Sequence, residues 1–182
     1  MSFSVDPFVQ LVAAGATAIV FARALVEKSS NFVVYAATLR DYRLVPEALA
    51  PFVAVCFFIA EISTVAFLVM PDTRGFGAIC AMVLLGLYAL AMALALLAGR
   101  EEIECGCGGE GQAVSWALVL RNVGLIAVAA LMLAPEAPRD LSWFDHAQIV
   151  CAILVFWLAL AIVEKTIDSQ SAVRRLRAQS FL

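Results

Sequence analysis

Long apolar runs alternate with short polar segments along the whole chain. Four runs are long enough to cross a bilayer as helices, residues 8–26, 52–70, 75–99 and 114–134, and a shorter fifth covers residues 147–163. A helix of about 20 apolar residues spans the hydrocarbon core, and a helix satisfies its own backbone hydrogen bonds there. The pattern therefore predicts an all-α integral membrane protein, a four-helix transmembrane bundle with a fifth transmembrane helix.

The polar connections differ in character. Residues 27–50 mix aromatic, aliphatic and charged side chains, which predicts an amphipathic segment lying along one end of the bundle. Residues 71–74 read as a tight turn, and Trp143 and Phe144 suit the membrane interface. We expect a membrane domain over residues 1–134, an interfacial loop and fifth transmembrane helix over 135–163, and a basic, solvated, helical tail over 164–182.

Composition supports a membrane protein and excludes several other classes. Hydrophobic residues make up 64% of the 182 residues and charged residues 15%, against about 45–50% and about 25% in soluble domains. The net charge of −3, without a basic block before the tail, argues against a nucleic-acid partner. A metal site needs about four ligands, and with one histidine in the chain none is expected. The first ten residues lack Lys and Arg, so we expect no cleavable signal peptide and a retained first helix.

The polar segment between the third and fourth apolar runs carries the chemistry. Cys105 and Cys107 are separated by Gly106 alone, and such a pair can close a small, strained disulfide of the oxidising, exchangeable kind. Gly106 and Gly109 give the backbone freedom for that ring and for approach by another protein. The spacing predicts a thiol–disulfide redox pair. The alternative is two unreactive loop cysteines, because four nearby glutamates disfavour the thiolate.

The remaining cysteines, Cys56, Cys80 and Cys151, fall within apolar runs. Cysteine behaves there as a small hydrophobic residue. We expect all three to be packing residues.

Two ionisable residues lie inside predicted spans, Glu61 in the second and Arg121 in the fourth. Because an unpaired charge in hydrocarbon is costly, we expect an interhelical Glu61–Arg121 ion pair. One interpretation is structural, with the pair fixing how two helices pack. The other is functional, with Arg121 and Asn122 donating hydrogen bonds to the carbonyl of a quinone that accepts electrons from the thiol pair. His146 is expected at the membrane interface.

The motifs together resemble a known family. The motif runs from Gly99-Arg100 through Cys105-Gly-Cys107 and Gly109 to Trp116 and Leu120-Arg-Asn122, and it resembles the MauE family of methylamine utilisation membrane proteins. The upstream features Lys28, Phe32, Tyr42-Arg-Leu-Val-Pro46 and Glu61 agree. The resemblance covers roughly residues 8–134, and its looser features are shared with DoxX-like membrane proteins. One departure is Gly108, where an aromatic residue is usual.

The resemblance implies a bacterial inner-membrane protein that matures methylamine dehydrogenase, whose small subunit carries several disulfides. It implies a thioredoxin-like, MauD-like partner and an exported client protein, with Cys105 and Cys107 as the redox pair. By similarity to the redox bundles of DsbB and vitamin K epoxide reductase, it also implies electron transfer to quinone. Arg121 and Asn122 would then support the acceptor, with Glu61, Gly106, Gly109 and Trp116 as supporting residues.

Orientation and class leave alternatives open. Most basic residues fall on the side of the cysteine loop, which by the positive-inside rule places that loop in the cytoplasm, whereas delivering disulfides to an exported protein needs the outer face. We favour the outer face. A rival function is a non-catalytic membrane scaffold that docks a thioredoxin-like or dehydrogenase partner. A small transporter is less favoured, because the spans lack paired glycine and proline breaks.

Overall fold

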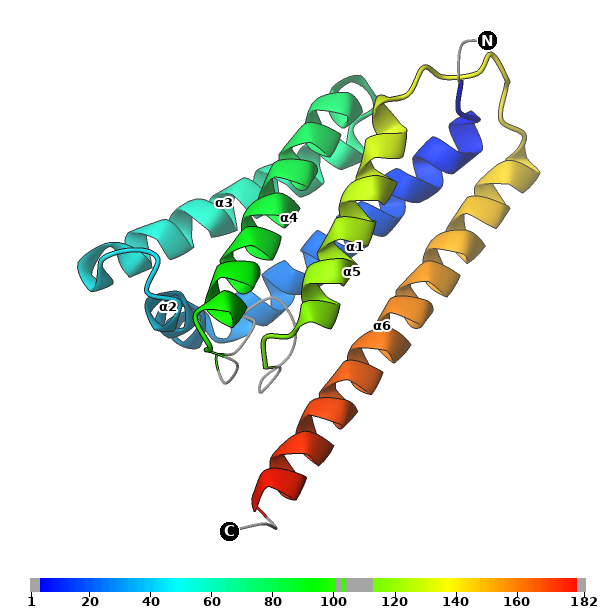
Figure 1. The fold of residues 1–182 in the computed structure, drawn as a ribbon. Helices are drawn as coiled ribbons and strands as arrows, with labels where there is room; N and C mark the ends of the chain where they lie inside the picture. Colours follow the sequence, from blue (N-terminus) through cyan, green and yellow to red (C-terminus); the bar gives the residue numbers. More distant parts are fainter. Residues whose placement is uncertain (1–3, 101–102, 104–112, 180–182) are drawn as a thin grey trace.

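The computed structural model describes residues 4–100, 103 and 113–179. These residues form six α-helices joined by short connections, three of which contain a single 3-10 turn (Figure 1). The α-helices are α1 (Pro7–Ser30), α2 (Phe32–Asp41), α3 (Ala50–Val69), α4 (Arg74–Leu97), α5 (Trp116–Ala130) and α6 (Trp143–Gln179). The 3-10 turns are Glu47–Leu49, Pro71–Thr73 and Leu131–Leu133.

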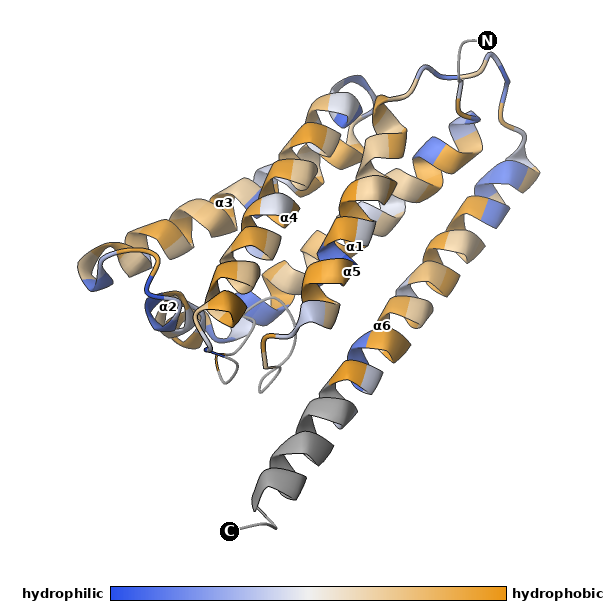
Figure 2. Cartoon of the chain, in the orientation of Figure 1, coloured by the Kyte–Doolittle hydropathy of each residue, from blue (hydrophilic) through white to orange (hydrophobic). Residues whose placement is uncertain are grey.

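Five helices are long and apolar enough to cross a membrane, which confirms the predicted fold class. They are α1, α3, α4, α5 and α6, extended in some cases by an adjoining 3-10 turn. Figure 2 shows apolar residues along the middle of these helices and polar residues mostly toward their ends and on α2. The protein is therefore a multi-pass membrane protein.

The bundle has two distinct ends (Figure 1). One end holds the N-terminus, the turn between α3 and α4 and the connection between α5 and α6. The other holds α2 and the α4–α5 connection, which contains the cysteines. We call this second end the loop end.

Small residues let the central helices approach closely. A cluster of buried alanines from α1, α4 and α5 fills the core near the first end, and larger side chains such as Phe21 and Leu125 fill the middle. Membrane helices associate through such close packing, because burial from lipid supplies little hydrophobic driving force. The core thus holds α1, α3, α4 and α5 as one unit.

Helix α2 lies along the loop end, as the amphipathic pattern of residues 27–50 predicted. Tyr35 and Ala36 on its inner face pack against Ala54 of α3, while Val33 on its outer face is 80% exposed. The predicted amphipathic segment is therefore a helix of 10 residues that covers part of the bundle's end.

Helix α6 docks on the outside of the bundle, chiefly against α1. Its side chain Ile153 lies so close to Gly15 that an added Cβ there would sit 2.2 Å from the Ile153 Cδ1 atom. Only 6% of the membrane-spanning part of α6 is buried within the protein, against 39% of that of α1. The fifth span and the predicted helical tail form one continuous helix, which projects beyond the loop end (Figure 1).

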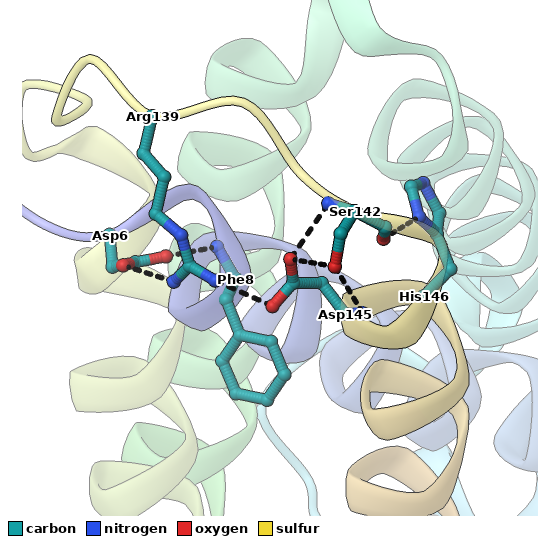
Figure 3. Close-up of polar contacts among 6 residues, drawn as sticks. All are labelled: Asp6, Phe8, Arg139, Ser142, Asp145 and His146. Carbon is teal, nitrogen blue, oxygen red and sulfur yellow. Dashed lines mark hydrogen bonds and ion pairs between the residues drawn. The ribbon is translucent and has the colours of Figure 1, made fainter.

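A polar network ties the N-terminus to the α5–α6 connection at the first end (Figure 3). The Arg139 guanidinium bridges Asp6, at 2.7 Å, and Asp145, at 2.6 Å. Val5 also exchanges backbone hydrogen bonds of 2.9 Å with Pro135 and Ala137. The hydrogen bond from Arg139 lowers the pKa of Asp6, as does the backbone N–H of Phe8. His146 is exposed there, with its Nδ1 atom 2.9 Å from the Ser142 carbonyl.

Candidate functional site

A lysine, a glutamate and a tyrosine from three helices meet inside the membrane. The Lys28 Nζ atom of α1 lies 2.5 Å from Oε1 of Glu61 on α3, and the Tyr88 hydroxyl of α4 donates to the same oxygen at 2.6 Å. The Lys28 and Glu61 side chains are 2% and 0% exposed. The ammonium also lies over the rings of Tyr35 and Tyr88, 4.6 and 4.9 Å from their centroids. The pair is neutral overall and sealed from solvent.

The expected Glu61–Arg121 pair is wrong. Glu61 binds Lys28, because α3 packs against α1 and α4, whereas α5 packs mainly against α4. The sequence did not predict Lys28 as the partner of Glu61, because the predicted first span ends at residue 26, two residues before Lys28. A helix that runs on to Ser30 brings Lys28 to the level of Glu61.

Arg121 forms its ion pair with the last helix instead. Its Nη1 atom lies 2.6 Å from Oε1 of Glu164 on α6, and Arg23 of α1 contacts the other carboxylate oxygen. The Arg121 and Glu164 side chains are 8% and 9% exposed. One carboxylate thus joins α1, α5 and α6. The sequence did not predict this contact, because Glu164 falls in the segment expected to be a solvated tail.

Asn122 and Trp116 take different positions on α5. Asn122 is 1% exposed, its Oδ1 atom accepts a long hydrogen bond of 3.4 Å from Arg121, and its Nδ2 atom has no partner among the described residues. A buried amide donor without a partner is uncommon. Trp116 begins the helix and is 57% exposed, at the loop end.

Cys105, Cys107, Gly106 and Gly109 lie outside the described residues, so their predicted roles stay predictions. The chain on either side of them is well anchored. The Arg100 Nη1 atom donates to the Tyr42 carbonyl at 2.9 Å, and the Val114 N–H donates to the Ile103 carbonyl at 2.9 Å. Ile103 and Val114 pack in one cluster that includes Tyr42 and Met92. The cysteine segment therefore begins and ends against the same part of the loop end.

The other cysteines are free thiols on the outer parts of the bundle. Cys56 and Cys151 are exposed, instead of packing inside the bundle as expected, and Cys80 is half-buried. In the part of the chain that the structure describes, no three His, Cys, Asp or Glu side chains group as metal ligands.

Comparisons with known proteins identify the family. The family model for the methylamine utilisation protein MauE matches residues 6–135. The chain belongs to the MauE family. It is 35% identical to MauE of Paracoccus versutus over 136 residues, which cover 72% of this chain and 73% of the relative. It is also 35% identical to MauE of Methylorubrum extorquens over 169 residues, 88% of this chain and 90% of the relative.

A third relative, MauE of Paracoccus denitrificans, is 33% identical over 129 residues. No solved structure gives a significant match. The family model ends at residue 135, before α6. Both partners of the Lys28–Glu61 pair lie inside the matched range, whereas Arg121 lies inside it and its partner Glu164 beyond it. The protein is thus a MauE-family methylamine utilisation protein with a sixth helix outside the matched domain.

Proposed function

We propose that this MauE-family protein is a membrane thiol–disulfide redox protein that assists disulfide formation in an exported protein. Its client is of the type of the methylamine dehydrogenase small subunit, and a thioredoxin-like, MauD-like protein is its partner. Cys105 and Cys107 form the redox pair. Family membership gives the biological setting, and the cysteine spacing gives the chemistry.

The observation that carries this proposal is the anchoring of the cysteine segment. Arg100, Ile103 and Val114 fix both sides of it against Tyr42 and its neighbours at the loop end. A thiol pair that exchanges with a soluble partner must be held at the membrane surface and remain reachable. The fixed flanks at the bundle's end support the first of these needs.

The proposed function places the loop end on the extracytoplasmic face of the bacterial inner membrane. The count of basic residues opposes this, but two of the residues counted have partners on other helices. Lys28 is paired with Glu61, and Arg23 is paired with Glu164. Topology is set by Lys and Arg in the flanking loops. A lysine or arginine neutralised inside the bundle is kept there for assembly and is weak evidence on orientation.

Quinone is the proposed electron acceptor, with Arg121 and Asn122 as its predicted supporting residues. The buried Asn122 Nδ2 donor supports that prediction, because it is available to a carbonyl oxygen. The engagement of Arg121 by Glu164 counts against a direct role for Arg121. Substituting Arg121 and Asn122 separately would therefore distinguish their roles.

The test is client maturation in a Cys107→Ser variant. We expect normal membrane insertion and loss of active client enzyme, with Cys80→Ser as the matched control that retains it. A membrane-impermeant maleimide, applied to intact cells lacking Cys56, Cys80 and Cys151, should label the pair only after mild reduction. Normal client maturation in Cys107→Ser would refute the redox function.

A second candidate is a non-catalytic scaffold that docks the thioredoxin-like or dehydrogenase partner. The exposed apolar side chains Val33 and Leu44, 80% and 49% exposed at the loop end, favour it. Trapping of a mixed disulfide between Cys105 or Cys107 and the partner decides between the two. A stable complex without any such disulfide would favour the scaffold.

A further inference from the structure

A cavity of about 220 Å³ opens between α2, α3 and α4. Its walls are almost wholly apolar and include four aromatic rings, Tyr35, Tyr42, Phe57 and Tyr88. An engineered apolar cavity of about 150 Å³ stays dry and admits benzene. This cavity therefore has room for one substituted six-membered ring.

The mouth of the cavity faces the lipid side of a membrane-spanning helix. Leu87, Leu90 and Leu94 of α4 line it and are 44%, 56% and 43% exposed. All three belong to a span with a mean hydropathy of 2.5. A molecule that reaches the cavity past these leucines comes from the hydrocarbon, so the ligand is lipid-soluble.

The inner wall of the cavity borders the buried ion pair. Tyr35 and Tyr88 line the cavity and also flank the Lys28 ammonium, and the Tyr88 hydroxyl is bonded to Glu61. The wall is thus built from aromatic rings, which suit a flat ring. An acyl chain would make no use of them.

The cavity is also joined to the anchors of the cysteine segment. Tyr42 and Met92 line it, Tyr42 accepts the hydrogen bond of Arg100, and both pack in the cluster that contains Ile103 and Val114. No other described feature brings the flanks of the cysteine segment and a ring-sized aromatic cavity to one place.

We propose that this cavity binds a lipid-soluble p-quinone, the electron acceptor of the redox pair, an inference that rests on the proposed function. The reaction balances. Two thiols lose two electrons and two protons to form one disulfide, and the quinone gains both to become a quinol. The acceptor then lies against the rings of Tyr35 and Tyr88.

The test is binding of a short-chain benzoquinone, with one isoprenyl unit, to the purified full-length protein in nanodiscs. Ala91→Phe puts a ring into the cavity. Val83→Phe, on an exposed site of the same helix away from the cavity, is the matched control. We expect affinity about tenfold or more lower for Ala91→Phe, and unchanged affinity for Val83→Phe. Circular dichroism and gel filtration verify that each variant is folded.

Two results would overturn the inference. One is wild-type affinity in folded Ala91→Phe. The other is equal competition by an alkane of matched length without a ring, which would make the cavity an acyl-chain site. Repeating the measurement in a Cys105→Ser/Cys107→Ser variant separates the two proposals. Quinone binding needs no thiols, so a failure of the redox function leaves this binding result intact.

Discussion

Removing both partners of the Lys28–Glu61 pair should destabilise the bundle by clearly less than the sum of the two single removals. The single variants are Lys28→Met and Glu61→Gln, and the double variant carries both changes. Each single change leaves one formal charge in a site where the two side chains are 2% and 0% exposed. The double variant leaves a neutral amide that can still accept a hydrogen bond from Tyr88.

The magnitude follows from burial and from the contacts that remain. Losing one partner of a buried ion pair costs about 3–5 kcal/mol. Here the cost falls toward the lower limit. After Glu61→Gln, the ammonium keeps its contacts with the Tyr35 and Tyr88 rings, and after Lys28→Met, the carboxylate keeps the Tyr88 hydroxyl. We expect about 3 kcal/mol for each single variant, and a coupling energy of about 2 kcal/mol in the double-mutant cycle.

Reversible unfolding in mixed micelles, followed by tryptophan fluorescence, measures the free energy of unfolding of all four proteins. Hydrogen bonds in membrane proteins average only about 0.6 kcal/mol, so a neutral pair would give a small coupling energy. Additive effects of the two single variants, within about 0.5 kcal/mol, would refute the ion pair as the source of stability.

Three further outcomes are expected. Gly77→Ala should destabilise the protein by about 1–3 kcal/mol through overpacking, because a Cβ there would lie 2.8 Å from the backbone nitrogen of Leu68. Gly86→Ala is the control, since a Cβ at Gly86 would have nothing within 4 Å. It should be neutral or slightly stabilising in the same unfolding assay. Glu164→Gln should lower the free energy of unfolding clearly more than Glu27→Gln. Glu164 is buried and contacts two arginines, whereas Glu27 makes a half-exposed i,i+4 pair with Arg23, and i,i+4 helix pairs are worth about 0.3–0.5 kcal/mol. Equal losses would contradict the three-helix junction. Carbon-13 NMR should find the pKa of Asp6 below its ordinary 3.8, and this pKa should move up toward 3.8 in Arg139→Gln. The stabilisation that ionised Asp6 provides is therefore fully present above its ordinary pKa and is lost as the pH falls through the lowered pKa.

The membrane spans were predictable because hydrocarbon imposes a strong compositional demand. Runs such as residues 75–99 have few alternatives to a transmembrane helix. The amphipathic character of residues 27–50 was also predictable from the sequence. A segment at the bundle's end must cover apolar surface with one face and contact water with the other.

The ion pairs were not predictable, because a charged residue after an apolar run can either end the span or continue it toward a partner on another helix. Lys28 follows the first apolar run and Glu164 follows the fifth, yet both lie within long helices. A charge continues a membrane helix when another helix supplies its partner, and that choice depends on packing. The predicted redox pair differs from the ion pairs in its source. It rests on the spacing of Cys105 and Cys107, which is read from the sequence alone.

The separation of ion-pair partners along the chain has a consequence for biogenesis. Lys28 enters the membrane 33 residues ahead of Glu61, and Arg121 enters 43 residues ahead of Glu164. Until each later helix is synthesised, the earlier one carries an uncompensated charge that favours the translocon or the interface over lipid. The last pairing waits for α6, so a nascent chain that stalls before Glu164 keeps its arginines exposed to the quality-control machinery. The pairing of Arg121 thus depends on a helix made after the four-helix core.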